Sequence, residues 1–392
     1  MKFFSTVLFF FLSSSSCQKI STAEQQILEF KPSLLLKDDN YLSEKKNLFE
    51  SWMMKFDKEY KTAEETLHRL HVWIKNHELI ERHNDQSPEP SYSLDHNQFS
   101  DMTWDEFQEY NKLGSYSPDT AKTMMLKTTA MEKEDHRRVL SDEDDVPKEW
   151  DWVEHGGVPP VKDQKMCGSC WAFSAIGAIE GARYVDTGNL TALSEQELVD
   201  CDKVDLGCGG GLMDNAFLFD ENTTHGICAE LDYPYVAHKH WFRGCRSKNR
   251  HFREKICTSV KHSRVQSFVD IENTVPALKA AIVKQTVSVA IQANLRSFQF
   301  YKKGIYDDEK CGNDLDHGVV AVGYGTEDDV PYFLVRNSWG PKWGDEGYIK
   351  MAQVSETNPN GTCGILSAAS RPILRENGGD DDDDDDDNEE SD

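Results

Sequence analysis

The sequence predicts an α+β protein whose main body has a helical half followed by a strand-rich half. The helical half contains a run over residues 170–186 that is apolar on almost every face, as a buried helix requires. The later half holds four apolar runs of strand length: "TVSVAIQA", "HGVVAVGYG", "PYFLVRNSW" and "GYIKMA". Because helices and strands are separated along the chain, we expect an α+β arrangement with an interface between the two halves.

Residues 1–17 have the composition of a secretory signal peptide. Met1 and Lys2 provide a positive start, residues 3–12 are mostly apolar, and residues 13–17 offer small residues for cleavage. The apolar run is too short to span a bilayer, and no later stretch reaches the length and purity of a membrane helix. We therefore expect a soluble protein without a membrane span in the secretory pathway, located in a lysosome, in a vacuole or outside the cell.

The segment after the signal has helical spacing over residues 49–84. Its apolar residues recur three or four positions apart, as an amphipathic helix requires: Leu67, Leu70, Trp73 and Ile74. "NDQSPEPS" breaks this pattern, and the next residues predict a short strand and then a helix capped near Asp101 or Thr103. Residues 111–145 are polar and irregular, which predicts an exposed linker where proteolytic cleavage concentrates.

The formal charge of −26 is unevenly distributed along the 392 residues. Residues 146–375 carry a net charge of −5, whereas residues 376–392 carry −12. The body is thus only mildly acidic, and nothing in it indicates a nucleic-acid-binding surface. Eight consecutive aspartates at 380–387 predict a disordered acidic tail, since such runs repel themselves. We interpret the tail as solubilising, and binding of cations or of a basic partner is the alternative.

Ten cysteines also favour the secretory pathway, because disulfides persist in oxidising compartments. Cys17 lies in or beside the signal, and the nine that remain predict several bridges and one free, reactive thiol. Three sequons agree with secretion and mark candidate glycosylation sites at Asn189, Asn222 and Asn360.

Two of the cysteines, Cys167 and Cys170, stand close together in "CGSCW". A zinc site would need a second ligand pair at matching spacing, but Cys201 and Cys208 are six residues apart and no His-x-x-x-His lies near them. The surrounding sequence also lacks a thioredoxin-like redox pattern. A cysteine that opens a buried helix is a better nucleophile, because the positive end of the helix dipole lowers the pKa of its thiol. Cys170 has this position.

"CGSCW" resembles the signature of the papain and cathepsin family of cysteine peptidases. His317 in "LDHGVVAVGYG" and Asn337 in "RNSWG" stand in motifs similar to those of the family, in the family's order. The resemblance runs from about residue 49 to residue 372 and is closest to the cathepsin L type. It implies a papain-like fold of two domains, with a long central helix in the left domain, a β-barrel-like right domain and an active-site cleft between them. A mainly helical propeptide would precede this fold.

The resemblance also implies the catalytic roles. The Cys170 thiolate would attack a peptide carbonyl, and His317 would protonate the leaving amine and later activate water. Asn337 would orient the imidazole under the shield of Trp339, while the side chain of Gln164 and the backbone N–H of Cys170 would form the oxyanion hole. No cofactor and no metal is implied.

Substrate contacts can be carried over in the same way. The walls of the pocket for the side chain second from the cut would be Leu212, Met213, Ala290, Leu315, Gly318 and Ala368. Asp316, Trp339, Gly210 and Gly211 would complete the substrate-binding set, with the glycines allowing close approach of the substrate backbone. Because an apolar wall rejects an unpaired charge, we expect a preference for Leu, Val or Phe rather than Arg.

The family's disulfides would join Cys167 to Cys208, Cys201 to Cys245 and Cys311 to Cys363, which leaves Cys170 free. Cys228 and Cys257 fall outside this pattern, and we expect a fourth bridge between them.

The leading segment resembles the inhibitory propeptides of cathepsin L-type enzymes. The matched helix positions are Glu65, Arg69, Trp73, Asn76, Ile80 and Asn84. "DHNQFSD" resembles the next propeptide motif, with Asp95 in place of its usual glycine. The segment would lie through the cleft in the non-productive direction until the linker is cut between residues 140 and 146. We expect acid to trigger this step, because protonation of the many carboxylates disrupts ion pairs.

The predicted organisation is therefore a signal at 1–17, a propeptide at 18–145, a peptidase at 146–375 and a tail at 376–392. The inhibitor domain of the propeptide would span about residues 48–110, followed by the linker at 111–145. We expect a monomeric endopeptidase acting on proteins and peptides and inhibited by its own propeptide. The alternative is a non-catalytic, acidic, secreted binding protein.

Overall fold

The structure is a computed structural model that describes residues 39–114, 146–221, 226–240, 244–245, 257, 259–355 and 358–375. The predicted signal peptide, most of the linker, the Asn222 sequon and the acidic tail lie outside the described residues. The chain divides into two units, residues 1–74 and residues 75–392, and each is treated by itself.

The first unit contains α2 (Asp39–Phe56) and the beginning of α3 (Ala63–Asn84). Its core is aromatic, with Phe49 packed edge-on against Trp73 at 5.9 Å between ring centroids. The helical spacing over residues 49–84 thus belongs to two helices rather than one. Asp57 ends the first helix in a left-handed conformation, with φ of 56°.

The second unit begins with the remainder of α3, followed by β1 (Tyr92–Leu94) and α4 (Trp104–Asn111). Thr103 caps α4, because its side chain accepts a hydrogen bond from the backbone N–H of Glu106 and the Glu106 side chain accepts one from Thr103. Of the two predicted caps, Asp101 and Thr103, the structure therefore has Thr103.

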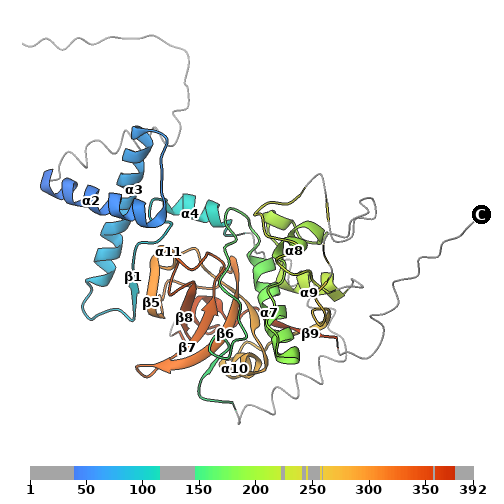
Figure 1. Ribbon diagram of the computed structural model, residues 1–392. Helices are drawn as coiled ribbons and strands as arrows, with labels where there is room; N and C mark the ends of the chain where they lie inside the picture. The colour runs from blue at the N-terminus through green and yellow to red at the C-terminus, as the bar shows by residue number, and fades with distance from the viewer. Residues whose placement is uncertain are drawn as a thin grey trace, which may run out of the picture. The chain divides into compact units, whose positions relative to one another are not determined.

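The helical half of the body consists of α7 (Cys170–Thr187), α8 (Glu195–Cys201), the short 3-10 helix η3 (Gly207–Gly209) and α9 (Met213–Glu221). Figure 1 shows α7 between the sheet and the other helices of this half. Accordingly, α7 is buried from its first residue to Arg183. It begins at the residue that the sequence predicted and ends before Gly188, whose φ of 69° closes the helix.

The strands form one sheet in the order β1-β5-β8-β7-β6-β4-β9-β3, with β2 (Trp150–Asp151) paired to β6. Their bounds are β3 (Val265–Asp270), β4 (Val287–Ile291), β5 (Tyr301–Tyr306), β6 (His317–Glu327), β7 (Val330–Arg336), β8 (Tyr348–Ala352) and β9 (Ala369–Leu374). The helices α10 (Val275–Lys284) and α11 (Arg296–Phe300) lie between strands in the sequence. All pairings are antiparallel except that of β5 with β8.

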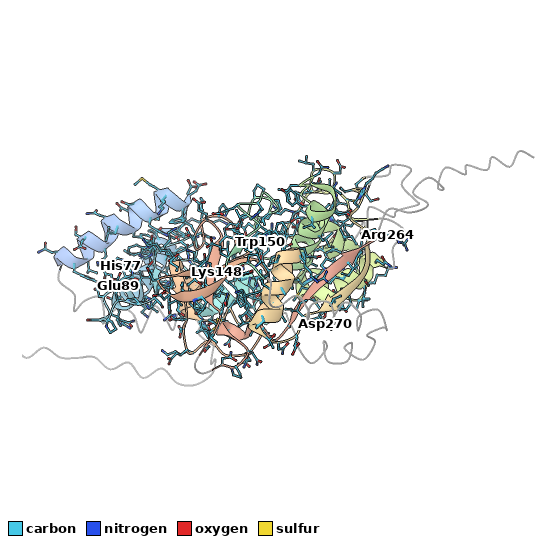
Figure 2. The ribbon with its side chains drawn as sticks, turned by 90° about the horizontal axis from the view of Figure 1, so that it is seen from below. His77, Glu89, Lys148, Trp150, Arg264 and Asp270 are labelled. Carbon is cyan, nitrogen blue, oxygen red and sulfur yellow. A yellow bond between two sulfur atoms is a disulfide. The ribbon has the colours of Figure 1, made fainter. Side chains whose placement is uncertain are left out.

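The sheet does not close into the β-barrel-like domain that the resemblance implied. Its described edges are β1 at one end and β3 at the other. Figure 2 labels Arg264, which directly precedes β3, and Asp270, the last residue of β3. The strands β3 and β9 pack against α9, and β9 also packs against α7. The β3 end of the sheet therefore packs on the helices α7 and α9, and β3 does not pair with β5.

At the other edge, β1 pairs with β5 across more than two hundred residues of sequence, with Tyr92 opposite Gly304. The propeptide therefore supplies a strand to the sheet of the peptidase body. In the described part of the chain, no helix is long and apolar enough to cross a membrane.

Four disulfides link the body: Cys167–Cys208, Cys201–Cys245, Cys228–Cys257 and Cys311–Cys363. These are the pairs that the sequence analysis named. Cys170 is the one described cysteine outside a bridge.

Candidate active site

Cys170 opens α7 and is buried, with 3% of its surface exposed. The disulfide from Cys167 holds the preceding turn, where the backbone N–H of Gly168 donates to the carbonyl of Cys208 at 3.0 Å. On the other side, the indole N–H of Trp171 donates to the carbonyl of Gly207 at 3.1 Å. The start of the helix is thus fixed from both directions, which fixes the position of the thiol.

His317 and Asn337 come from neighbouring strands. His317 is the first residue of β6 and Asn337 follows β7, its antiparallel partner. Their side chains meet at 2.8 Å between His317 Nε2 and Asn337 Oδ1. Trp339 stacks on the imidazole with ring centroids 4.8 Å apart, and all three side chains are buried.

The histidine also lies beside Cys170. The backbone N–H of the next residue, Gly318, interacts with the Cys170 thiol. A side chain on Gly318 would come within 3.3 Å of the Cys170 carbonyl. The second ring nitrogen of His317, Nδ1, has no hydrogen-bond partner among the described residues, so it remains available for a proton from the thiol.

Burial sets the protonation states of this pair. It raises the pKa of Cys170 to about 11, against the opposing effect of backbone N–H groups from Gly318, Trp171 and Cys170 itself. It also lowers the pKa of His317 to about 4, although the bond to Asn337 works in the other direction. The expected lowering of the thiol pKa at the helix start is thus overridden here, because the thiol is buried. Both shifts favour the neutral forms of the two side chains.

Gln164 is fully buried and held by several hydrogen bonds. Its Oε1 accepts from Ser338 Oγ at 2.6 Å, and its carbonyl accepts from the hydroxyl of Tyr235 at 2.8 Å. Its amide nitrogen Nε2 donates to the carbonyl of Cys167 at 3.0 Å and to that of Asn111 at 3.3 Å. The amide therefore points towards the start of α7. Ser338 and Tyr235 were not predicted as site residues from the sequence, although Ser338 stands inside the "RNSWG" motif.

Residues of the propeptide cover one side of the site. The Gln98 side chain donates to the carbonyl of Trp339 at 2.7 Å. Phe99 and Phe107 both contact the Trp339 ring edge-on, with centroids 6.0 Å and 5.3 Å away. Farther along, the backbone N–H of Gly114 donates to the carbonyl of Asp316 at 3.3 Å. This segment therefore blocks the side of the site on which Trp339 and Asp316 lie.

The predicted pocket walls come together beside the thiol. One apolar cluster contains the walls from both halves of the body: Leu212, Met213, Ala290, Leu315 and Ala368. Gly318 borders the cluster, since a side chain there would lie 3.2 Å from Met213 Sδ. Gly210 has φ of 110°, a conformation that favours glycine.

Asp316 has a different environment. Its Oδ1 accepts from the backbone N–H of Ala293 at 2.7 Å, and burial raises its pKa to about 7. It supports the chain around Ala293 and is not an apolar wall.

Two of the three sequons fall on described residues. Asn189 is exposed just after α7, and Asn360 is partly exposed. Across the described ranges, no three His, Cys, Asp or Glu side chains are grouped so that they could hold a metal ion.

The profile described as "Papain family cysteine protease" matches residues 146–373. The chain belongs to this family. A second profile, described as "Cathepsin propeptide inhibitor domain", matches residues 49–107. The chain is therefore a papain-family cysteine protease that carries its own inhibitory propeptide, as the resemblance had implied.

Relatives and solved structures agree with this assignment. "Cysteine protease XCP2" from Arabidopsis thaliana is 38% identical over 370 residues, which is 92% of this chain and 94% of that protein. "Germination-specific cysteine protease 1" from the same plant is 43% identical, over 78% of this chain and 77% of the relative. A solved structure described as "Recombinant stem bromelain precursor" has a TM-score of 0.71 and 33% identity, covering 85% of this chain and 99% of that one. The proform of the ragweed pollen allergen Amb a 11 also has a TM-score of 0.71, at 29% identity and covering 87% and 98% of the two chains.

Proposed function

We propose that this papain-family protease cleaves peptide bonds through a thioester on Cys170, with His317 as acid and base. Asn337 positions the imidazole, and Gln164 stabilises the oxyanion. The observation that carries the proposal is the 2.8 Å bond between His317 Nε2 and Asn337 Oδ1 beside the buried start of α7. That bond leaves Nδ1 as the ring nitrogen that exchanges protons.

The reaction begins with transfer of the thiol proton from Cys170 to His317 Nδ1. The thiolate adds to the peptide carbonyl, and the oxygen takes up negative charge between the N–H of Cys170 and the amide of Gln164. His317 then gives its proton to the leaving amine as the C–N bond breaks, which leaves an acyl thioester. Water loses a proton to His317 and attacks the thioester, and the carboxylic acid product leaves as Cys170 regains its proton.

The propeptide blocks this sequence at two points. Cys170 and His317 are buried in this form, which favours their neutral states, and the Asn111 carbonyl of the propeptide takes a hydrogen bond from the Gln164 amide. Removal of the propeptide admits water and frees the amide for the oxyanion. We expect cleavage between residues 140 and 146, with the peptidase at residues 146–375.

The substrate pocket favours apolar side chains second from the cut. Its clustered walls are Leu212, Met213, Ala290, Leu315 and Ala368. An arginine placed among them would lose its hydration without gaining a carboxylate partner from these walls.

The signal-like residues 1–17 and the inhibitory propeptide support a location in the secretory pathway, and its destination is the lysosome, the vacuole or the extracellular space. Within this proposal the enzyme is a monomer, and Asn189, Asn222 and Asn360 are its glycosylation candidates. The tail at 376–392 keeps it soluble, with cation or basic-partner binding as the second interpretation.

Labelling with a thiol-directed epoxide tests the proposed function. We expect the acid-processed protein to be labelled at Cys170 and to lose peptidase activity together with the labelling. Cys170→Ser should abolish both. A non-catalytic binding protein, the alternative from the sequence, would not couple labelling to loss of peptide cleavage.

A further inference from the structure

Two buried carboxyl groups lie behind the glycine segment, defined here as residues 210–212. Asp202 and Asp205 belong to the loop between α8 and η3, and they are 2% and 6% exposed. Asp202 Oδ1 accepts from the backbone N–H groups of Val204 at 2.7 Å and of Asp205 at 3.3 Å. The loop is therefore folded around the first carboxyl group, which also holds the backbone of the second.

Asp205 in turn holds the glycine segment. Its Oδ1 accepts from the backbone N–H of Leu212 at 3.1 Å and from the amide of Asn215 at 2.8 Å. A side chain on Gly211 would come within 2.6 Å of the Asp205 carboxyl carbon, so the segment lies directly on this group. The position of Asp205 thus sets the position of the backbone on which we expect the substrate to lie.

The second oxygen of each carboxyl group has no hydrogen-bond partner among the described residues, although both are buried. Asn215 Oδ1 is a third buried oxygen in the same state, on a side chain that is 4% exposed. The two carboxyl groups lie close together, since Asp202 Oδ1 accepts from the backbone N–H of Asp205 at 3.3 Å and the charge of Asp202 acts on the Asp205 carboxyl group. Two buried charges at this distance repel strongly, whereas one proton between them would satisfy both oxygens.

Charges on the neighbouring elements do not supply this compensation. Asp200 on α8 is bonded to His240 and Tyr233, and Asp214 on α9 accepts from Ser370. Two lysines lie nearby, with Lys203 exposed in the same loop and the stem of Lys239 against Gly207. Burial and Asp202 together raise the pKa of Asp205 to about 8, against the hydrogen bonds from Asn215 and Leu212.

We propose that Asp202 and Asp205 share one proton and that this protonated pair is a positioning element for substrate binding by residues 210–212. The inference rests on the proposed peptidase function and adds to it a pH-dependent affinity. While the proton is held, the loop and the glycine segment stay in place. When it is lost in mild alkali, the two carboxylates repel each other, and Asp205 moves with the Leu212 backbone that it holds. The contribution of the pair to stability is therefore present in acid and lost as pH rises through the raised pKa.

The test separates KM from kcat in the processed enzyme, with a peptide that extends three residues to the amino side of the cut. Between about pH 6 and about pH 9 we expect KM to rise about tenfold, the change that one pKa unit of coupling produces. Asp202→Asn should remove this rise, because its amide donates to Asp205 Oδ2 at every pH. Asp232→Asn makes the same chemical change on an exposed side chain and should keep the rise.

If Asp202→Asn does not fold, Asp205→Asn is the second test variant. Its amide oxygen still accepts from the Leu212 N–H, but it removes one of the two carboxyl groups that share the proton. An unchanged rise in KM in both carboxamide variants would overturn the inference and leave the proposed peptidase intact. A wild-type enzyme without thiol-dependent cleavage would instead overturn the proposed function. If Ca²⁺ lowered KM at the alkaline end, or EDTA raised it in acid, a cation would occupy the space between the oxygens and the shared proton would be refuted.

Discussion

The amide nitrogen of Gln164 donates a hydrogen bond to the carbonyl oxygen of Asn111, 3.3 Å away. Gln164 belongs to the peptidase body, and Asn111 is the last residue of α4 in the propeptide. A peptide carbonyl therefore already lies against the donor that we assign to the oxyanion. We infer that the propeptide inhibits the site in part by occupying this donor.

Replacing this donor should cost turnover. We expect Gln164→Ala to lower kcat by about 10²–10³-fold, the usual loss for one oxyanion donor. KM should change much less, because the lost bond strengthens only as charge develops on the carbonyl oxygen. Steady-state kinetics of the processed enzyme measure both constants. Ser338→Ala, which removes the hydroxyl bonded to Gln164 Oε1 but leaves the amide, is the matched control and should lose less.

The thiol should be unreactive in the zymogen. Burial raises the pKa of Cys170 to about 11, so the protonated form dominates at neutral pH and alkylation should accelerate only as pH rises towards that value. Removal of the propeptide admits water and should move the reactive range to lower pH. Iodoacetamide labelling of the full chain and of the processed enzyme across pH compares the two. Equal rates at neutral pH in both forms would contradict this account.

Acid release should depend on a histidine pair in the propeptide. His77 Nδ1 and His96 Nε2 are 2.9 Å apart, with the rings stacked and Glu81 bound to the other nitrogen of His77. One nitrogen must donate and the other accept, so the bond is lost when both rings are protonated. His96 adjoins Asn97, whose amide bonds to the carbonyl of Gln299 in the peptidase body at 2.7 Å. Protonation should therefore loosen the segment that covers the site.

We expect His96→Gln to slow processing at mildly acidic pH, because the amide keeps a polar contact without titrating. The half-time of propeptide loss, followed on gels over a range of pH, measures the effect. His155→Gln, at an exposed position in the peptidase body, is the control and should process like the wild type. A variant at His96 with an unchanged pH profile would leave the carboxylates as the source of acid sensitivity.

Peptide-library cleavage should show Leu, Val or Phe second from the cut. The physical reason is the apolar cluster that contains Leu212, Met213, Ala290, Leu315 and Ala368. The library needs to vary this position alone, with the other positions held constant. A profile led by arginine would mean that a carboxylate reaches the pocket in the processed enzyme, and the wall assignment would be wrong.

Short-range patterns predicted the parts of the site that depend on local sequence. The apolar run that starts at Cys170 predicted the helix that holds the thiol. The cap of α4 is likewise local, because Thr103 and Glu106 form it three residues apart. Family motifs located His317 and Asn337, which the structure brings to 2.8 Å. In each case the deciding residues lie within a few positions of one another.

Contacts between segments that lie far apart in the chain could not be predicted from local sequence patterns. The thiol pKa illustrates the difference, because the helix start predicts a lowered value whereas burial in the folded protein raises it. The Gln164–Asn111 bond joins residues 53 positions apart, and nothing near either residue marks it. The open sheet likewise follows from the packing of β3 and β9 on the helices, which no strand pattern encodes.

The strand β1, which the propeptide pairs with β5, depends on a residue of the peptidase body. A side chain on Gly304 would come within 2.4 Å of the carbonyl oxygen of Ser91, which accepts a hydrogen bond from the backbone N–H of Ile305 at 2.9 Å. The pairing of β1 with β5 therefore depends on a glycine whose φ of 88° also favours this residue, and this glycine remains after the precursor segment is gone. Once that segment leaves, β5 has a bare backbone edge open to another chain, so maturation exposes a new surface for association along with the catalytic cleft.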